Sequence, residues 1–225
     1  MNFLLEVIAS SVDDAIEAEQ GGAGRVELCV NLAAGGMTPP IEMVRQVARR
    51  VRIPVRVMVC ENDSYSRPGA AELRRLCETM RKMEDLGVEG VVIGFDLAGV
   101  LDVESLTAMV AAAPVLRVTF HRVFERLRDR VGAVGLLKTI PQVDRILLCD
   151  GDWDPLVRAS APEIRLIAGG GLKMEDFLRL LATTKVREFH TGRPVRGGQQ
   201  SDGRVNARLV RNLIEQLTTS LFSHS

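Results

Sequence analysis

The sequence predicts an α/β fold, a single-domain (β/α)8 TIM barrel that spans residues 1–225. The first observation is that short β-branched runs alternate with longer helical patterns, and that they do so eight times. The second is the length, because 225 residues exceed one ordinary domain but suit one compact barrel. The third is that several strands alternate polar and apolar residues, whereas a parallel strand buried on both faces of an open sheet is almost entirely apolar.

The predicted strands follow one another along the chain with helical patterns between them. Apolar residues recur at helical spacing in these intervals, as in Ile41, Val44, Val47 and Val51. Strands that alternate with helices pair in parallel through βαβ units, so the competing architecture is a doubly wound open sheet. The eight predicted strands are residues 3–9, 25–30, 54–60, 90–94, 115–121, 144–148, 163–168 and 186–190.

Capping residues mark where several helices begin and end. Ser11 with Asp14 three residues later resembles a capping box, and Thr38 before Pro39 predicts another helix start. Glycines at 21–22 and 87 stand where the first and third helices are expected to stop.

The alternation within the strands predicts a polar barrel interior. If the aliphatic residues face the helices, then a set of charged side chains shares the space inside the barrel, and we expect Glu27 to pair there with Arg56 on the next strand. Residues at the carboxyl ends of the strands are better functional candidates, because active sites of these barrels lie there. The interior set is Glu6, Glu27, Arg56, Arg117 and Glu188, and the candidates at the strand ends are Asn31, Cys60, His121 and His190.

Composition excludes several classes of function. Lys+Arg and Asp+Glu number 29 each, so the formal net charge is zero and no basic excess indicates nucleic acid. No apolar run approaches the roughly 18 residues that a membrane helix needs. Four widely spaced cysteines in a chain without secretory features predict free thiols in a cytoplasmic protein.

Glycine-rich segments after the seventh and eighth strands predict an anion site. Gly169, Gly170 and Gly171 close the seventh strand, and Thr191-Gly192-Arg193 follows the eighth. These two loops form the recurrent phosphate site of TIM barrels, where backbone N–H groups receive the anion; the alternative is a tight turn with a structural role.

Such a site would suit an isomerase, epimerase or lyase that acts beside a carbonyl of a small anionic metabolite. Glu27 or Glu6 could then serve as the general base and His121 as the acid or electrophile, while Arg122 and Arg56 stabilise negative charge. Asn31, His190 and Arg193 would complete the ligand contacts at the mouth. No motif in the sequence names the reaction.

The chain also resembles the CutC family, named for copper homeostasis. The matching segments occur in the family's order over nearly the whole chain. The resemblance implies a cytoplasmic TIM barrel, commonly a homodimer, that is linked to copper handling. The segments are RVELC (25–29), NL (31–32), GGMTP (35–39), GVVIG (90–94), VTFHR (118–122), GGG (169–171) and REFH (187–190).

Two segments depart from the family pattern. In the third strand Arg56 stands where the family usually has His, and Cys60 where it has Arg. The end of the sixth strand, usually Thr-Ser-Gly-Gly, is Leu148-Cys149-Asp150-Gly151 here. Both segments fall at the expected mouth of the barrel, so the resemblance does not imply an identical ligand or reaction.

Copper is the cofactor that the resemblance raises. Cu(I) prefers thiolate and thioether ligands, and Cys29, Met58 and Cys60 share one parity on adjacent predicted strands. The alternative is that they are ordinary core side chains, since no CxxC spacing is present. A zinc site that joins His121 and His190 to Glu27 or Glu6 is disfavoured, because the two histidines lie on strands that are not adjacent.

The sequence thus leads to a cytoplasmic CutC-type protein of copper homeostasis, with Cu(I) binding as the hypothesis for its chemistry. The alternative is a metal-independent barrel enzyme on a small anionic, phosphorylated metabolite. A noncatalytic binding or assembly protein ranks last, because barrels with polar mouths usually host chemistry. In either leading case the partner is a small molecule or a metal ion, with no nucleic acid and no membrane.

Overall fold

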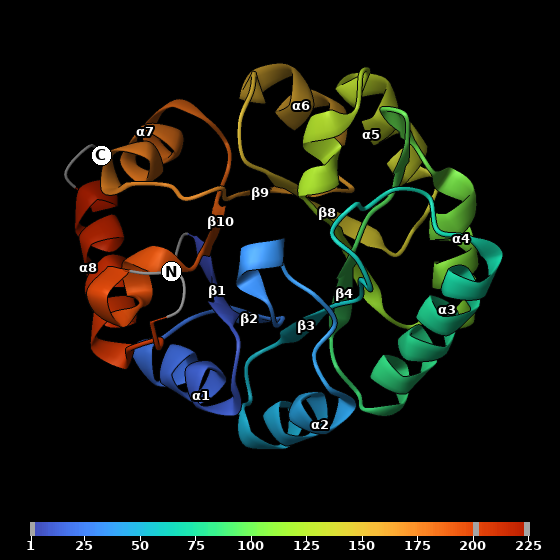
Figure 1. Cartoon of the computed structure of the whole chain (residues 1–225). Helices are drawn as coiled ribbons and strands as arrows, with labels where there is room; N and C mark the ends of the chain where they lie inside the picture. The colour runs from blue at the N-terminus through green and yellow to red at the C-terminus, as the bar shows by residue number, and fades with distance from the viewer. Residues whose placement is uncertain (1–2, 200–202, 223–225) are drawn as a thin grey trace.

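The computed structural model describes residues 3–199 and 203–222 and contains a closed barrel of eight parallel strands (Figure 1). Around the barrel the strands neighbour one another in the order β1-β10-β9-β8-β7-β4-β3-β2. This confirms the (β/α)8 TIM barrel. The strands are β1 (Leu4–Ala9), β2 (Arg25–Leu28), β3 (Val55–Met58), β4 (Gly90–Ile93), β7 (Arg117–Phe120), β8 (Val143–Leu148), β9 (Arg165–Ala168) and β10 (Glu188–Thr191).

Helices form a ring outside the strands (Figure 1). Between β4 and α4 lies a short antiparallel hairpin of β5 (Asp96–Leu97) and β6 (Val100–Leu101). One 3-10 segment follows β2, one follows β7 and two follow β10. The helices are α1 (Val12–Gly21), α2 (Ile41–Arg50), α3 (Ala70–Asp85), α4 (Val103–Ala112), α5 (Arg130–Lys138), α6 (Trp153–Ser160), α7 (Met174–Thr183) and α8 (Ala207–Phe222). None of the described helices has the length and apolarity needed to cross a membrane.

Local sequence explains most of the helix ends. The Ser11 hydroxyl accepts a hydrogen bond from the Asp14 N–H at the start of α1, and Gly22 ends that helix at φ 95°. The predicted cap at Thr38 is wrong, because α2 begins later, at Ile41 after Pro40. The Thr38 hydroxyl instead bonds the backbone of Cys60 and ties the loop after β2 to the end of β3.

The apolar face of each strand packs against the helices. Val26, Leu28, Val57, Phe120 and Phe189 are fully buried there, as the alternation predicts. The opposite faces fill the barrel with polar groups in the half where the strands begin and leave a cavity in the half where they end.

Ion pairs cross the barrel interior in the half where the strands begin. Arg25 bonds Glu6 and Glu188, and Arg145 also bonds Glu188. Arg56 lies 2.8 Å from Glu89 and 2.7 Å from Asp144 and donates to the Thr119 hydroxyl. These carboxylates satisfy the buried guanidinium groups, as a low-dielectric interior requires.

Two expectations about this interior are wrong. Glu27 does not pair with Arg56, although the two residues are neighbours in the register of β2 and β3, because the guanidinium of Arg56 is taken by Glu89 and Asp144. Arg117 is exposed and donates only to the Pro141 carbonyl, since it is the first residue of β7 and lies at the edge of the barrel where the strands begin.

Candidate functional site

A cavity of about 350 Å³ opens at the carboxyl ends of the strands, and we call it the mouth cavity. Its wall combines acidic, basic and imidazole side chains with glycines and sulfur atoms. The polar and charged side chains that line it are Glu27, His121, Arg122, His190, Arg193 and Arg196, the glycines are Gly35, Gly170, Gly171 and Gly192, and the sulfur-bearing residues are Cys29, Met58 and Cys149.

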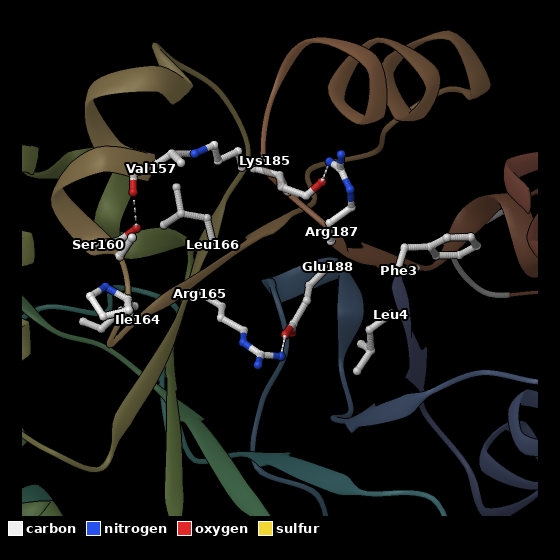
Figure 2. Close-up of a pocket in the computed structure, with 13 residues that line it drawn as sticks. Phe3, Leu4, Val157, Ser160, Ile164, Arg165, Leu166, Lys185, Arg187 and Glu188 are labelled. Atoms are coloured by element: carbon white, nitrogen blue, oxygen red, sulfur yellow. Dashed lines mark hydrogen bonds and ion pairs between the residues drawn. The ribbon is translucent and has the colours of Figure 1, made fainter. Parts of the chain in front are cut away.

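A second hollow of about 460 Å³ lies at the opposite end, where β1, β9 and β10 begin, and we call it the floor groove. Figure 2 shows Arg165 there, reaching Glu188 at 3.2 Å, with Lys185 and Arg187 nearby. Because chemistry in these barrels is carried at the carboxyl ends of the strands, the mouth cavity is the candidate site.

Three buried titratable side chains meet at one side of the mouth cavity. His190 Nδ1 lies 2.8 Å from Glu6 Oε1 and 3.8 Å from Glu27 Oε2. Glu6 is also bonded by Arg25, whereas the buried Oε2 atom of Glu27 has no hydrogen-bond partner among residues 3–199 and 203–222. Glu27 is therefore the acidic group in this cluster with an oxygen left unpaired.

The environments of the two glutamates shift their pKa values in opposite directions. Burial raises the pKa of Glu27 to about 7. Burial acts on Glu6 as well, but the Arg25 and His190 charges outweigh it and hold the pKa of Glu6 far below its usual range. Burial opposes the charged form of His190, yet the Glu27 and Glu6 carboxylates raise its pKa overall. Glu27 can therefore exchange protons near neutral pH, with the His190 imidazole beside it.

His121 follows β7 and is a different kind of imidazole. Its Nδ1 atom accepts a hydrogen bond from the Val123 N–H at 3.3 Å, so the neutral ring carries its proton on Nε2. Burial lowers the pKa of His121 to about 3. The ring packs edge-on against Tyr65, with centroids 4.7 Å apart. His121 is thus a neutral hydrogen-bond donor in the cavity wall.

The loops after β9 and β10 contribute residues with unbonded backbone N–H groups to the wall of the mouth cavity. Gly170 and Gly171 both have φ 84°, a conformation that favours glycine. Within the described part of the chain, no acceptor bonds the N–H groups of these two glycines, of Gly192 or of Arg193. The Arg193 guanidinium lies beside Gly171, where an added Cβ would stand 2.5 Å from Nη2.

Gly169 does not belong to this group. Its N–H donates to the Leu148 carbonyl at 2.9 Å and continues the ladder between β8 and β9. Gly169 therefore serves the barrel, and the glycine-rich segment leaves only its second and third members free.

The sulfur residues that we expected to converge do so only in part. Cys29 and Met58 line the mouth cavity, and an added Cβ at Gly36 would lie 3.5 Å from Cys29 Sγ and 3.8 Å from Met58 Cε. Cys60 is outside the cavity and donates its thiol to the Asn62 carbonyl at 2.8 Å. Its strand β3 ends at Met58, so the alternation no longer decides where Cys60 points.

Other predicted site residues are divided between the mouth and the rest of the fold. Arg122 lines the cavity as expected. Asn31 does not; it is exposed and begins the 3-10 turn Leu32–Ala34 with φ 54°. Arg56 is held in the interior ion pairs and is not a mouth residue.

Sequence reasoning missed three residues that line the mouth cavity and a fourth that lies beside its wall. Arg196 is buried and bonds Asp14 and the Ile8 carbonyl, and only its place in the basic loop after Arg193 marks it in the sequence. Cys149 was noted as a departure from the family pattern but not as a site residue. Tyr65 and Gly35 come from two loops that only the tertiary structure brings together.

One group of side chains in the described residues has the spacing to hold a metal ion. Glu6, Glu27 and His190 each offer a ligand atom, and these atoms lie within 4.8 Å of one another. Glu6 is already bonded by Arg25 and His190, so a metal would have to compete for it. Cys29 and Cys60 are not part of this group.

Comparison with known proteins supports the family resemblance that the strand sequences indicate. The sequence model of the CutC family matches residues 3–194. The chain belongs to the CutC family. The resemblance seen in the sequence is thereby confirmed.

Relatives of this CutC chain include a copper homeostasis protein cutC homolog of Mus musculus, 33% identical over 84% of this chain and 72% of the relative. A CutC family protein of Xanthomonas campestris is 34% identical over 83% of this chain and 81% of the relative. The solved structure of a CutC protein from Streptococcus agalactiae matches with a TM-score of 0.74 and 25% identity, over 84% of this chain and 98% of that one. Thiamine phosphate pyrophosphorylase from Pyrococcus furiosus, at 13% identity and a TM-score of 0.64, shares the fold.

Proposed function

We propose that this CutC-family chain is a barrel enzyme that binds a small phosphorylated metabolite in the mouth cavity and moves a proton on it. The observation that carries the proposal is a set of N–H groups, at Gly170, Gly171, Gly192 and Arg193, that bond no described residue. These four residues line the same cavity as Glu27 and His121. Backbone donors in these two loops are the usual phosphate ligands of TIM barrels.

The chemistry would be proton transfer beside a carbonyl. Glu27, with a pKa of about 7, would take a proton from the carbon next to the carbonyl. The neutral His121 would donate from Nε2 to the carbonyl oxygen, which gains negative charge as the proton leaves. A carboxylate base with a neutral imidazole is a working combination in a known barrel isomerase.

Anion binding is tested first, by thermal denaturation with increasing phosphate or glycerol phosphate. A ligand of the native state raises the melting temperature in a saturable way. Arg193→Met should lower the apparent affinity, whereas Lys185→Met, which removes an exposed charge at the floor groove, should not. Gly170→Val is a poor test, because its Cβ would come within 2.5 Å of Cys149 Cβ. No saturable shift with any phosphate compound would contradict the proposal.

Proton transfer is tested by nuclear magnetic resonance in deuterated water with a panel of aldose and ketose phosphates. A substrate should lose the signal of one carbon-bound proton, and Glu27→Gln should slow that loss by about 100-fold or more. Retained exchange in Glu27→Gln would remove Glu27 from the mechanism.

A second candidate function is Cu(I) binding, in keeping with the names of the relatives. It is favoured by Cys29 Sγ and Met58 Cε, which both approach the same point above Gly36 in the cavity wall. Burial raises the pKa of the Cys29 thiol well above its usual range, so the metal would have to displace a proton. Anaerobic Cu(I) titration against a chelator should therefore show an affinity that rises with pH.

Matched cysteine variants test this candidate. Cys29→Ala should weaken Cu(I) binding by at least about tenfold, because thiolates dominate affinity for soft metals. Cys60→Ala should leave it unchanged, since Cys60 lies outside the cavity. Equal losses in both variants would contradict a site at Cys29 and Met58.

A further inference from the structure

We propose that the mouth cavity recognises a ligand with two anionic groups, a phosphate at the loops after β9 and β10 and a carboxylate at Arg122 and Tyr65. The inference rests on the proposed function and adds the class of substrate. Arg122 and Tyr65 form what we call the second pole of the cavity.

The second pole contains a buried donor without a partner. Tyr65 is 2% exposed, and its hydroxyl has no hydrogen bond to any described residue. A buried hydroxyl left in this state costs free energy, so it normally finds an acceptor. Burial also raises the pKa of Tyr65, which keeps the hydroxyl protonated and able to donate. A ligand oxygen would give this hydroxyl the acceptor that no described residue supplies.

A guanidinium group stands beside that hydroxyl. Arg122 Cζ lies 5.6 Å from the centroid of the Tyr65 ring. Arg122 has no ion pair with any acidic residue in the described parts of the chain. The flat donor fork of an unpaired arginine matches the two oxygens of a carboxylate.

A glycine of the cavity wall lies against both donors, and one of them, Arg122, lines the cavity itself. Gly35 lines the cavity with φ 95°, and a Cβ at this position would lie 2.2 Å from Arg122 Nη2 and 2.4 Å from Tyr65 Oη. Any larger residue at this position would collide with both donors. The edge-on contact with His121 holds the Tyr65 ring in place.

The two poles differ in chemistry and border the same cavity. Free backbone N–H groups and Arg193 suit the several oxygens of a phosphate. A guanidinium with a phenol suits a carboxylate. A cavity of about 350 Å³ restricts the ligand to a small molecule. The chemical class is thus a short phosphorylated hydroxy acid or keto acid.

Calorimetric titration with a matched pair of probes tests the inference. Phosphoglycerate and glycerol phosphate both carry a phosphate, but only the first carries a carboxylate. Phosphoglycerate should bind about tenfold or more tightly, as expected for a carboxylate held by charge-assisted hydrogen bonds.

Single substitutions identify the residues that cause the preference for phosphoglycerate over glycerol phosphate. Arg122→Met should abolish the preference for phosphoglycerate, and Tyr65→Phe, which keeps the ring that packs on His121, should reduce it by about two- to tenfold. Arg193→Met should weaken both probes by a similar factor. Lys185→Met at the floor groove (Figure 2) removes one charge without touching the mouth and should change neither affinity.

The possible failures can be told apart. If glycerol phosphate binds and phosphoglycerate binds no tighter, the second pole is refuted while the proposed function stands. A preference that survives in both Arg122→Met and Tyr65→Phe also refutes it. If no phosphate compound binds to the wild-type protein, the inference and the proposed function fail together.

Discussion

Two glutamates on adjacent strands show how a single neighbouring arginine changes the pKa of a buried carboxyl group. Glu6 and Glu27 are both buried beside His190, yet the pKa of Glu6 is held low and that of Glu27 is raised to about 7. The difference is that Arg25 bonds Glu6, whereas none of the arginines that the structure describes bonds Glu27. A carboxylate without a cationic bond is costly to bury in its charged form.

Glu27→Gln is predicted to be more stable than the wild type at neutral and higher pH. The folded pKa of Glu27 is above its ordinary value of 4.5, so the folded protein binds more protons than the unfolded one between that value and about 7. Wild-type stability therefore falls as pH rises through this window. The variant lacks this pH-dependent contribution of Glu27. The difference in free energy of unfolding between the variant and the wild type should therefore grow in favour of the variant by about 1–3 kcal/mol between pH 5 and pH 8.

Urea denaturation over this pH range measures the difference. Glu6 is not a suitable site for the same substitution, because its carboxylate is bonded by Arg25 and His190. A Glu27→Gln variant that loses stability relative to the wild type as pH rises would show that Glu27 is a structural ion-pair partner.

At the scale of elements, a single arginine joins several strands of the barrel. Arg56 on β3 is fully buried and bonds Thr119 on β7, Asp144 on β8 and Glu89 just before β4. A shift of register between β7 and β8 separates the pairs Val118–Val143 and Thr119–Arg145, and Asp144 lies between them on β8. The strands are thus connected by side chains in addition to the backbone ladder.

Arg56→Met is predicted to reduce the free energy of unfolding by about 1–3 kcal/mol, because Glu89 and Asp144 lose their hydrogen bonds to a buried guanidinium. The cost is limited because both carboxylates are partly exposed and Asp144 keeps its ion pair with Arg145. Arg117→Met is the matched control on β7. Arg117 is exposed and makes a single long bond to the Pro141 carbonyl, so its loss should cost no more than about 0.5 kcal/mol. Similar costs for the two variants would refute the structural role assigned to Arg56.

The whole molecule carries acidic groups with opposite effects on stability. Arginines and, for Glu6, His190 lower the pKa values of Glu6 and Glu188 against the effect of burial. Their contribution is present above the ordinary pKa of 4.5 and is lost as pH falls below it. Glu27 acts in the other direction, since its contribution declines as pH rises toward about 7.

Stability of the wild type is therefore predicted to be greatest near about pH 5. Urea denaturation across the acid and neutral range would locate the maximum, and in Glu27→Gln it should broaden toward neutral pH. A wild-type stability that rises steadily from pH 5 to pH 8 would contradict the balance described here.

The homodimer and the cytoplasmic location stay predictions, and sedimentation equilibrium would test the first.

The alternation of strands and helices was enough to predict the barrel. Alternating side chains on β2, β3 and β10 also indicated that Glu27, Cys29, Met58 and His190 face inward, because successive residues of a strand point to opposite sides. The order of the elements placed the loops at Gly170 and Arg193 next to each other at the carboxyl ends.

Tertiary structure alone decided which charged groups pair and which stay free. Glu27 and Arg56 are neighbours in register, but the guanidinium of Arg56 bonds two other carboxylates. It lies 2.8 Å from Glu89, just before β4, and 2.7 Å from Asp144 on β8. The meeting of Tyr65, Gly35 and Arg122 joins three loops far apart in the sequence. Strand periodicity sets the side to which a residue points, whereas partner choice depends on distances across the barrel that only the packed structure contains.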